Sequence, residues 1–343
     1  MSELRQDPIT GRWVVIAEGR SVRPNEYATP ARPSAPADCP FCEGQENRTP
    51  PEVAAIRPES TTTNGPGWTV RTIPNRFPTL APDAPAVVPS RVPTLLEAQP
   101  GYGYHEVIIV SPRHEPAFPF LRADHVRTVV RMFRDRVAAL AAKPRISAVL
   151  LFENYGPESG GTLVHPHAQI VATPVVPPVL VEEADGMRRF SKKQRGKCLL
   201  EAIRNEERRR KSRVLVDDGT FLALAPFAST HPYEILLLPQ RHAATIAEAT
   251  DTELDRLAEL LPALLRAQIA MEPSLSYNYF VHGAPNPVKS HPEFHWHVEI
   301  APRLVRPDGF ELGSGIAVNP VSPEAAALAL RTALSQSADP ATR

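Results

Sequence analysis

Apolar and polar positions follow the same order in two stretches of the chain. In the first stretch, an apolar run rich in β-branched residues begins after His105 and ends at Pro112, which favours a buried strand. Apolar residues at helical spacing then predict a helix, with Asp124 as its candidate N-cap. The predicted order is a strand from His105, a helix at 125–143, a strand at 147–152, a glycine-rich turn at 156–161 and a strand-like segment at 165–173.

The second stretch repeats this order. Its apolar run after Tyr233 ends at Pro239, and the helix that follows has Thr250 or Asp251 as its candidate N-cap. Pro262 falls inside this helix, so we expect a kink or a break there. The predicted elements are a strand from Tyr233, a helix at 252–271, a strand at 276–282 and a further segment at 295–300.

An Arg-His pair and a His-x-His segment recur at matching distances in the two stretches. His114 precedes His165 by 51 residues, and His242 precedes His295 by 53 residues. Shared order and spacing indicate an internal duplication. We therefore predict an α+β fold in which antiparallel sheets have helices packed against them. The expected units are one domain at 1–190, a similar domain at 191–335 and a frayed tail at 336–343.

The composition excludes several classes of protein. The 38 Lys and Arg residues balance 38 Asp and Glu residues, so charge gives no reason to expect nucleic acid or a membrane surface as a partner. No apolar run reaches the roughly 18 residues of a membrane span. The first residues lack the apolar segment of a signal peptide, so we expect a cytoplasmic enzyme. Ten of the 39 prolines lie in two clusters at 24–40 and 78–93, which predicts extended surface loops there.

A candidate phosphate site lies in the first stretch. His165, His167 and Gln169 are spaced two apart, so on one strand they would share a face. The glycine-rich turn before them would let backbone N–H groups approach an anion closely. The remaining candidate donors are Asn154, Gly160, Gly161 and Thr162. Two imidazoles, an amide and a glycine-rich loop together favour chemistry on a phosphate group.

The cysteines suggest a metal. Cys39 and Cys42 have the spacing of a zinc-binding pair, whereas Cys198 stands alone in the sequence. The alternatives are a redox-active pair or two ordinary reduced thiols. No thioredoxin-like strand and helix pattern surrounds the pair, which favours zinc.

The motif His-Pro-His-Ala-Gln at 165–169, with Phe-Glu-Asn upstream and Cys-x-x-Cys near the N-terminus, resembles the galactose-1-phosphate uridylyltransferases. They are a branch of the histidine-triad superfamily, and the resemblance extends over nearly the whole chain. It implies duplicated histidine-triad-like domains, with His167 as the nucleophile that forms a covalent nucleotidyl intermediate. Gln169 stands where histidine-triad hydrolases have a third His, which favours transfer over hydrolysis. The resemblance also implies nucleotide contacts by Arg20, Arg23 and Asn75.

Three functions follow from the resemblance. The first is transfer of UMP between hexose 1-phosphates, from UDP-glucose to galactose 1-phosphate. The second is phosphorolysis of a nucleotide sugar, because the segment 309–315 is similar to that of the ADP-glucose phosphorylases. The third is a nucleotide-binding protein without catalysis, which the intact His167 and Gln169 disfavour. The resemblance further implies a homodimer that binds a nucleotide sugar and a sugar 1-phosphate.

The resemblance adds His114 and His165 to the cysteine pair as the ligands of one structural Zn²⁺. The duplication predicts a second metal site at equivalent positions, with glutamate in place of the last cysteine. This second set is Cys198, Glu201, His242 and His295. Some relatives instead have a site of one Glu and three His, which would here be Glu183, His282, His295 and His297. A third alternative is that the second half binds no metal.

The duplication also makes His297 the counterpart of His167. The second half has Ala-Pro-Asn-Pro at 284–287 where the first has its glycine-rich turn, and Glu299 replaces Gln169. A carboxylate on that face would repel a phosphate. We therefore expect nucleotidylation of His167 alone.

Overall fold

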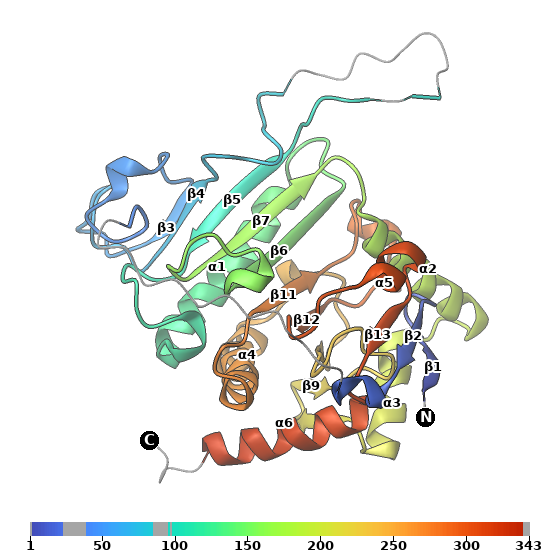
Figure 1. The fold of residues 1–343 in the computed structure, drawn as a ribbon. Coiled ribbons are helices and arrows are strands. Elements are labelled where there is room, and N and C mark those ends of the chain that lie inside the picture. The colour runs from blue at the N-terminus through green and yellow to red at the C-terminus, as the bar shows by residue number, and fades with distance from the viewer. Residues whose placement is uncertain (1, 23–38, 85–94, 97, 339–343) are drawn as a thin grey trace.

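The computed structural model describes residues 2–22, 39–84, 95–96 and 98–338, and its main feature is one large antiparallel sheet. Figure 1 shows this sheet running through the middle of the molecule. Its strands, in spatial order, are β3 (Ala54–Ile56), β4 (Val70–Pro74), β5 (Tyr104–Ile109), β7 (His167–Thr173), β6 (Ala148–Tyr155), β11 (Tyr277–His282), β12 (His297–Pro302), β10 (Ile235–Pro239), β9 (Phe221–Leu224) and β8 (Val214–Asp217).

The two predicted sheets are joined edge to edge. β6 pairs with β11, from Tyr155 opposite Tyr277 to Leu151 opposite Val281. The two tyrosine rings stack with centroids 4.6 Å apart. On either side of this seam, the order β5-β7-β6 mirrors the order β10-β12-β11, which agrees with the expected duplication. The predicted α+β class with antiparallel strands is confirmed, whereas the boundary at residue 190 stays a prediction.

Three helices cover one face of the sheet: α1 (Ala123–Ala141), α4 (Asp251–Met271) and α6 (Pro323–Ala338). Between sheet and helices lies the largest apolar cluster, to which alternate residues of β7, such as Ala168 and Ile170, contribute. α6 extends into the segment 336–343 that we expected to be frayed, and residues 339–343 lie outside the described part of the chain.

Helix boundaries correct two expectations. α1 begins at Ala123 with Arg122 as N-cap, so Asp124 is inside the first turn, where a carboxylate is favourable beside the helix N-terminus. α4 begins as predicted, with Thr250 and Glu253 forming a capping box. It then continues through Pro262 without a break. Pro262 is buried, and the packing of the buried residues of α4 offsets the missing backbone hydrogen bond.

A second pair of helices packs on the other side of the sheet. α2 (Pro178–Lys193) and α3 (Leu199–Arg210) enclose an apolar cluster with the alternate residues Leu222 and Leu224 of β9 and Leu236 and Leu238 of β10. Ile9 from the N-terminal segment completes this cluster. The N-terminal segment thus packs against the C-terminal half of the chain.

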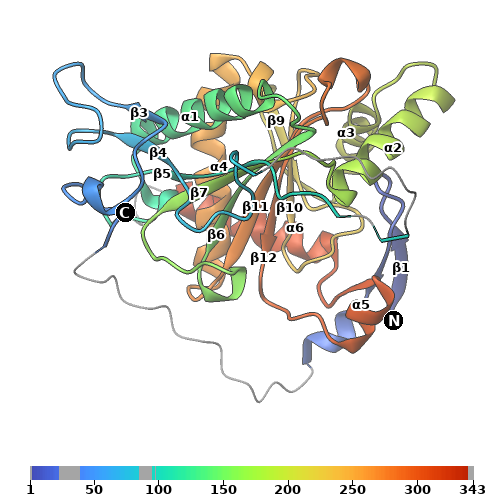
Figure 2. The ribbon, with the colours of Figure 1, turned by 90° about the horizontal axis from the view of Figure 1, so that it is seen from above.

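A small three-stranded sheet continues this contact. It consists of β1 (Glu3–Gln6), β2 (Trp13–Ile16) and β13 (Ala317–Asn319), and β13 pairs in parallel with β2. The small sheet and strands β3–β5 lie at opposite ends of the molecule (Figure 1, Figure 2). The remaining elements are α5 (Gly309–Ser314) and the 3-10 turns at Glu18–Val22, Glu46–Arg48, Phe118–Phe120, Pro157–Ser159, Ile246–Glu248 and Val288–Ser290.

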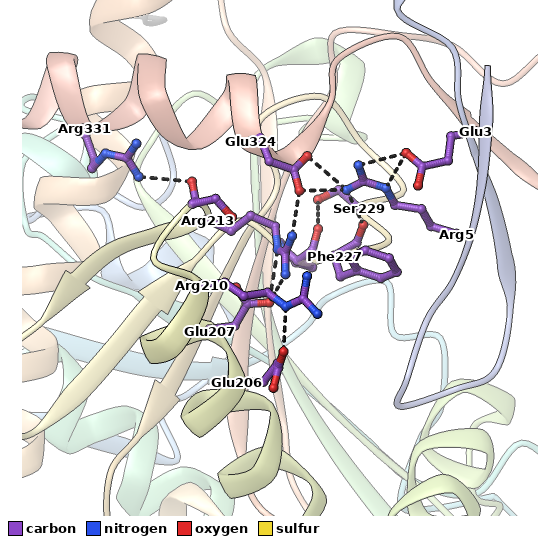
Figure 3. A network of polar contacts seen from close by, with 12 residues as sticks. Glu3, Arg5, Glu206, Glu207, Arg210, Arg213, Phe227, Ser229, Glu324 and Arg331 are labelled. Carbon is purple, nitrogen blue, oxygen red and sulfur yellow. Dashed lines mark hydrogen bonds and ion pairs between the residues drawn. The ribbon is translucent and has the colours of Figure 1, made fainter. Parts of the chain in front are cut away.

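A partly buried ion network fixes the small sheet to the C-terminal half. Glu324 at the start of α6 accepts hydrogen bonds from Arg5 of β1 at 3.0 Å and from Arg213 at 2.6 Å (Figure 3). Arg213 also binds Glu207 of α3 at 2.7 Å, and both arginines lie against the ring of Phe227. Loss of one partner would leave a buried charge uncompensated. Within the described chain, no helix is both long and apolar enough to cross a membrane.

Gly186 on α2 provides a test of the contact between α2 and the N-terminal segment around Ile9. A Cβ added there would meet the carbonyl oxygen of Ile9 at 1.7 Å, so Gly186→Ala must push the N-terminal segment away. We expect the free energy of unfolding in urea to fall by about 2 kcal/mol, because overpacking outweighs the gain in helix propensity. The matched control is Gly313→Ala in α5, where nothing lies within 4 Å. Equal effects of the two substitutions would contradict the close contact.

Candidate active site and metal clusters

His167 and Gln169 lie on the face of the sheet opposite to α1 and α4. Alternation along β7 directs Ala168 and Ile170 into the helix-covered core, so the two functional side chains point the other way. His165 precedes the strand, because β7 begins at His167. Pro166 lacks the N–H that a strand residue would contribute, which accounts for the later start. The predicted common face therefore holds for His167 and Gln169, and His165 turns toward the cysteines.

The imidazole of His167 is held in one tautomer. Its Nδ1 lies 2.7 Å from the carbonyl oxygen of His165, to which it donates. Burial lowers the pKa of His167, although the bond to His165 opposes this shift. The ring is therefore neutral near pH 7 and keeps a lone pair on Nε2. Phe41 packs its ring edgewise against His167 with centroids 5.5 Å apart, which fixes the ring plane.

His167 opens into a pocket formed by the end of β6 and the glycine-rich loop. Gly160 lies outside the pocket and lines a neighbouring one. The N–H of Gly160 bonds the carbonyl of Pro157, and the N–H of Gly161 bonds that of Gly156. The expected anion-binding backbone groups are thus engaged within the loop. The predicted residues that line the pocket are Asn154, Gly161, Thr162, His165 and His167.

His105 is a site residue that we did not predict from the sequence. It lies on β5, and its Nδ1 accepts a hydrogen bond from the N–H of Thr79 at 3.1 Å. Its Nε2 therefore carries the proton and donates to Oε1 of Gln169 at 2.8 Å. This bond orients the Gln169 amide so that its NH₂ group is available to a phosphoryl oxygen. The feature of the sequence that could have identified His105 is a histidine at the start of an apolar strand.

The predicted nucleotide-binding residues do not all come together in the structure. The amide Nδ2 of Asn75 lies 3.1 Å from Nε2 of His105. Arg20 pairs with Asp308, the N-cap of α5, at 3.0 Å and does not line the pocket. Arg23 lies outside the described residues.

The first predicted metal set is assembled. Sγ of both Cys39 and Cys42 lies 3.6 Å from Nδ1 of His165, and His114 completes the cluster. Tetrahedral zinc with its usual bond lengths separates sulfur and nitrogen ligands by about 3.6 Å. Nε2 of His165 donates to the carbonyl of Ser111 at 2.8 Å, which leaves Nδ1 free for a metal. Burial lowers the pKa of His165 to about 4, so the ring is neutral as a ligand must be.

A second cluster contains three of the four residues that the duplication predicted. Sγ of Cys198 lies 3.5 Å from Nδ1 of His295, and His242 is the third member. Glu201 is not part of the cluster. It lies in the first turn of α3, so the expected four-ligand set is reduced to three. Three protein ligands are fewer than a closed structural zinc site has.

A third cluster combines Glu183 of α2 with His282, His297 and Glu299. His295 does not belong to it, which corrects the expected set of one Glu and three His. Oε1 of Glu183 lies 2.8 Å from Nδ1 of His282 and 3.7 Å from Nε2 of His297. Burial alone would lower the pKa of His297, but the carboxylates of Glu183 and Glu299 raise it to about 10. When His297 is neutral, the four groups offer a cation four ligands.

The two halves use their His-x-His segments in the same way. His295 precedes β12 and turns toward Cys198, just as His165 precedes β7 and turns toward Cys39. His297 begins β12 and donates from Nδ1 to the carbonyl of His295 at 3.1 Å. Beyond this point the halves differ, because Glu183 occupies the space in front of His297. The second half therefore presents no open imidazole there.

Comparisons with known proteins agree with these features. Residues 1–177 match the family model described as the N-terminal domain of galactose-1-phosphate uridyl transferase, and residues 183–328 match that of its C-terminal domain. The chain is 31% identical to the ADP-glucose phosphorylase of Arabidopsis thaliana, with 96% of this chain and 92% of that protein covered. It is 29% identical to the galactose-1-phosphate uridylyltransferase of Thermotoga maritima, with 96% and 98% covered.

Solved structures give the same result. The crystal structure of an Arabidopsis thaliana ADP-glucose phosphorylase with bound ADP-glucose superposes with a TM-score of 0.81 at 29% identity, covering 96% of this chain and 99% of that one. A structure of uridylyltransferase superposes with a TM-score of 0.76 at 27% identity, covering 99% and 100%. With both family domains matched in order and the fold shared over nearly the full length, the chain belongs to the galactose-1-phosphate uridylyltransferase family.

Proposed function

We propose that the protein transfers a nucleotidyl group from a nucleotide sugar to a phosphate-containing acceptor through a covalent nucleotidyl-His167. The observation that carries this proposal is the state of His167: a neutral ring with Nδ1–H held by a carbonyl and Nε2 open to the pocket. A neutral imidazole so oriented is a nucleophile, and the carbonyl stabilises the charge that develops on the ring.

The two half-reactions balance without a further proton donor. Nε2 of His167 attacks the α-phosphorus, the N–P bond forms, and the P–O bond to the sugar 1-phosphate breaks with its electron pair on the leaving oxygen. In the second half-reaction, an oxygen of the acceptor phosphate attacks the same phosphorus, and the N–P electron pair returns to Nε2. The leaving group is a stable anion, so the neutral Gln169 suffices where a hydrolase needs an acid.

Gln169 and Asn154 are the side chains that would hold the phosphoryl oxygens. The amide of Gln169 is oriented by His105, and its NH₂ group has no hydrogen-bond partner among the described residues. Asn154 lines the pocket beside His167. Hydrogen bonds from fixed neutral donors stabilise the charge of the transition state and do not trap the covalent intermediate as a cation would.

ADP-glucose as donor and inorganic phosphate as acceptor are the substrates we favour. This choice is supported by the similarity to the Arabidopsis thaliana phosphorylase in sequence and in fold. The segment 309–315, which resembles that of the ADP-glucose phosphorylases, forms α5 and its C-cap here. Transfer of UMP from UDP-glucose to galactose 1-phosphate is the second candidate, and the similarity to the Thermotoga maritima uridylyltransferase supports it.

Radioactive α-phosphate in each nucleotide sugar distinguishes the two candidates. We expect ADP-glucose to label the protein, and added phosphate to release the label as ADP. Under the second candidate, UDP-glucose labels the protein and only a hexose 1-phosphate releases the label, as a new nucleotide sugar. Absence of label from both donors would contradict nucleotidyl transfer itself.

We also propose that Cys39, Cys42, His114 and His165 hold one structural Zn²⁺. The sulfur–nitrogen distances and the free Nδ1 of His165 support this assignment. When bound, the ion would crosslink the segment of Cys39 and Cys42 to His165, which directly precedes β7. It would so fix the carbonyl of His165 that orients His167. The cluster of Cys198, His242 and His295 is the second place where zinc fits, with three protein ligands.

A homodimer is the assembly we propose. Large apolar side chains are exposed on and near α5, where they would be covered by a second copy. Phe310 is 51% exposed and Leu312 is 77% exposed. Val305 and Leu304 on the preceding segment are also exposed.

A further inference from the structure

A chain of hydrogen bonds leads from the C-terminal half of the sheet to the His167 pocket. The guanidinium of Arg303, just after β12, donates from Nε to Oδ1 of Asn278 at 2.5 Å. Asn278 lies on β11 and donates from Nδ2 to Oδ1 of Asn154 at 2.7 Å. Asn154 is opposite Asn278 across the seam between the two halves, and it lines the pocket with His167.

The chemistry of these groups fixes the direction of every bond. A guanidinium cannot accept, so the Asn278 atom that faces Arg303 must be its carbonyl oxygen. The NH₂ group of Asn278 then faces Asn154, and it also donates to the backbone carbonyl of Ser159 at 3.0 Å. Asn154 must therefore present its own oxygen to Asn278. Its Nδ2 has no partner among the described residues and remains for the pocket.

Arg303 is suited to hold the Asn278 amide in this orientation. No carboxylate of the described chain lies within ion-pair distance of its guanidinium, and burial lowers the pKa of Arg303 while Glu234 opposes the shift. Nη1 of Arg303 lies 2.7 Å from Nε2 of His231, which accepts because the other ring nitrogen faces Thr230 and Glu234. A half-buried cation held by two neutral acceptors keeps a fixed direction without a competing ion pair.

We propose that Asn278, locked by Arg303, is a positioning residue for nucleotidyl transfer: it holds the Asn154 amide with its NH₂ group toward the phosphoryl group that His167 attacks. The inference rests on the proposed function and adds residues of the second half to it. Asn154 would contact the substrate, whereas Asn278 and Arg303 act through it. The seam between the halves thus contributes to the active site as well as to the fold.

We call the hydrogen bonds from Arg303 through Asn278 to Asn154 the relay. Asn278→Asp reverses the direction of the hydrogen bond to Asn154 with little change in side-chain shape. A carboxylate only accepts, so Asn154 must turn its NH₂ group toward Asp and its carbonyl oxygen into the pocket, where it repels phosphoryl oxygens. We expect the rate of labelling by nucleotide sugar to fall by about a hundredfold or more, the usual effect of losing one transition-state donor. The thermal midpoint should change little, because the new ion pair with Arg303 offsets the lost hydrogen bond to the carbonyl of Ser159.

A double-mutant cycle separates this role from a merely structural one. Asn154→Ala should slow labelling to a similar extent, and Asn278→Asp should then add less than about threefold in the Asn154→Ala background. Full additivity of the two effects would overturn the relay. Arg303→Met should also slow labelling and Arg303→Lys should restore part of the rate, since an ammonium can still donate to Asn278. The control is Arg306→Met, because the exposed guanidinium of Arg306 pairs with Glu158 instead.

A measurement without substrate keeps the relay testable if the proposed function fails. If the wild-type protein takes no label from either nucleotide sugar, the proposed function is refuted. The relay is then tested by the hydrogen exchange of the two asparagine side chains. In protein labelled with ¹⁵N-asparagine, both side-chain amide protons of Asn278 are bonded and buried, whereas those of Asn154 face the pocket. We expect the Asn278 protons to exchange with water at least about tenfold more slowly. Equal exchange rates would overturn the relay.

Discussion

Replacement of His167 by alanine is expected to abolish covalent labelling by a nucleotide sugar with a radioactive α-phosphate. The reason is that the ring of His167 is neutral and opens into the pocket, whereas the free Nδ1 of His165 faces Cys39 and Cys42. The label on wild-type protein should be lost in acid and retained in base, as for a phosphoramidate. Turnover should fall with the label, because both half-reactions pass through the same N–P bond.

The matched control is His297→Ala. This histidine holds the same position in the second half, but Glu183 and Glu299 lie 3.7 and 3.6 Å from its Nε2. Labelling should therefore persist in His297→Ala, although its thermal midpoint should fall because Glu183 loses a buried partner. Label recovered on His297, or full turnover in His167→Ala, would contradict the assignment of His167 as the nucleophile.

The second large effect concerns the cysteine cluster. Cys42→Ser should reduce the zinc content measured by elemental analysis by about one equivalent. Loss of a metal that crosslinks Cys39 to His165 should lower the free energy of unfolding by more than about 3 kcal/mol. Labelling should also slow, because His165 supplies the carbonyl that orients His167.

Cys198→Ser provides the comparison for that experiment. Cys198 is buried whereas Cys42 is partly buried, but both thiols lie beside a histidine, and Cys198 belongs to the cluster in the other half. Its replacement should leave the zinc at Cys42 and the labelling of His167 in place. If Cys42→Ser retains the zinc content of the wild type, the first cluster is not a zinc site.

The repeated pattern was the part of the fold that sequence could predict. The run after His105, the cap at Thr250 and the His-x-His segments each depend on local spacing, and local spacing survives into the structure. The continuity of the sheet could not be predicted, because the pairing of β6 with β11 joins residues more than a hundred positions apart. Of the kink or break expected at Pro262, the break did not occur, since tertiary packing of α4 outweighs a local preference.

For the site, sequence spacing identified ligands more reliably than it grouped them. Cys39, Cys42, His114 and His165 come together as predicted. In the second half, the sequence assigned some ligands to the wrong cluster. His295 precedes β12 and turns toward Cys198, whereas His297 begins β12 and faces Glu183, so the two histidines enter different clusters. His105 was missed since its role arises from a contact across β5 and β7 that no local motif encodes.

The seam at β6 and β11 also bears on how the two halves could diverge. A symmetric pair of identical subunits would carry every substitution twice, once on each side of its interface. Joined in one polypeptide, the two halves vary separately, so one could keep Gln169 and a glycine-rich loop while the other acquired Glu299 and closed its histidine behind Glu183. Neither half could then be released as an independent protein, because β6 or β11 would become an open strand edge in the middle of what is now a continuous sheet.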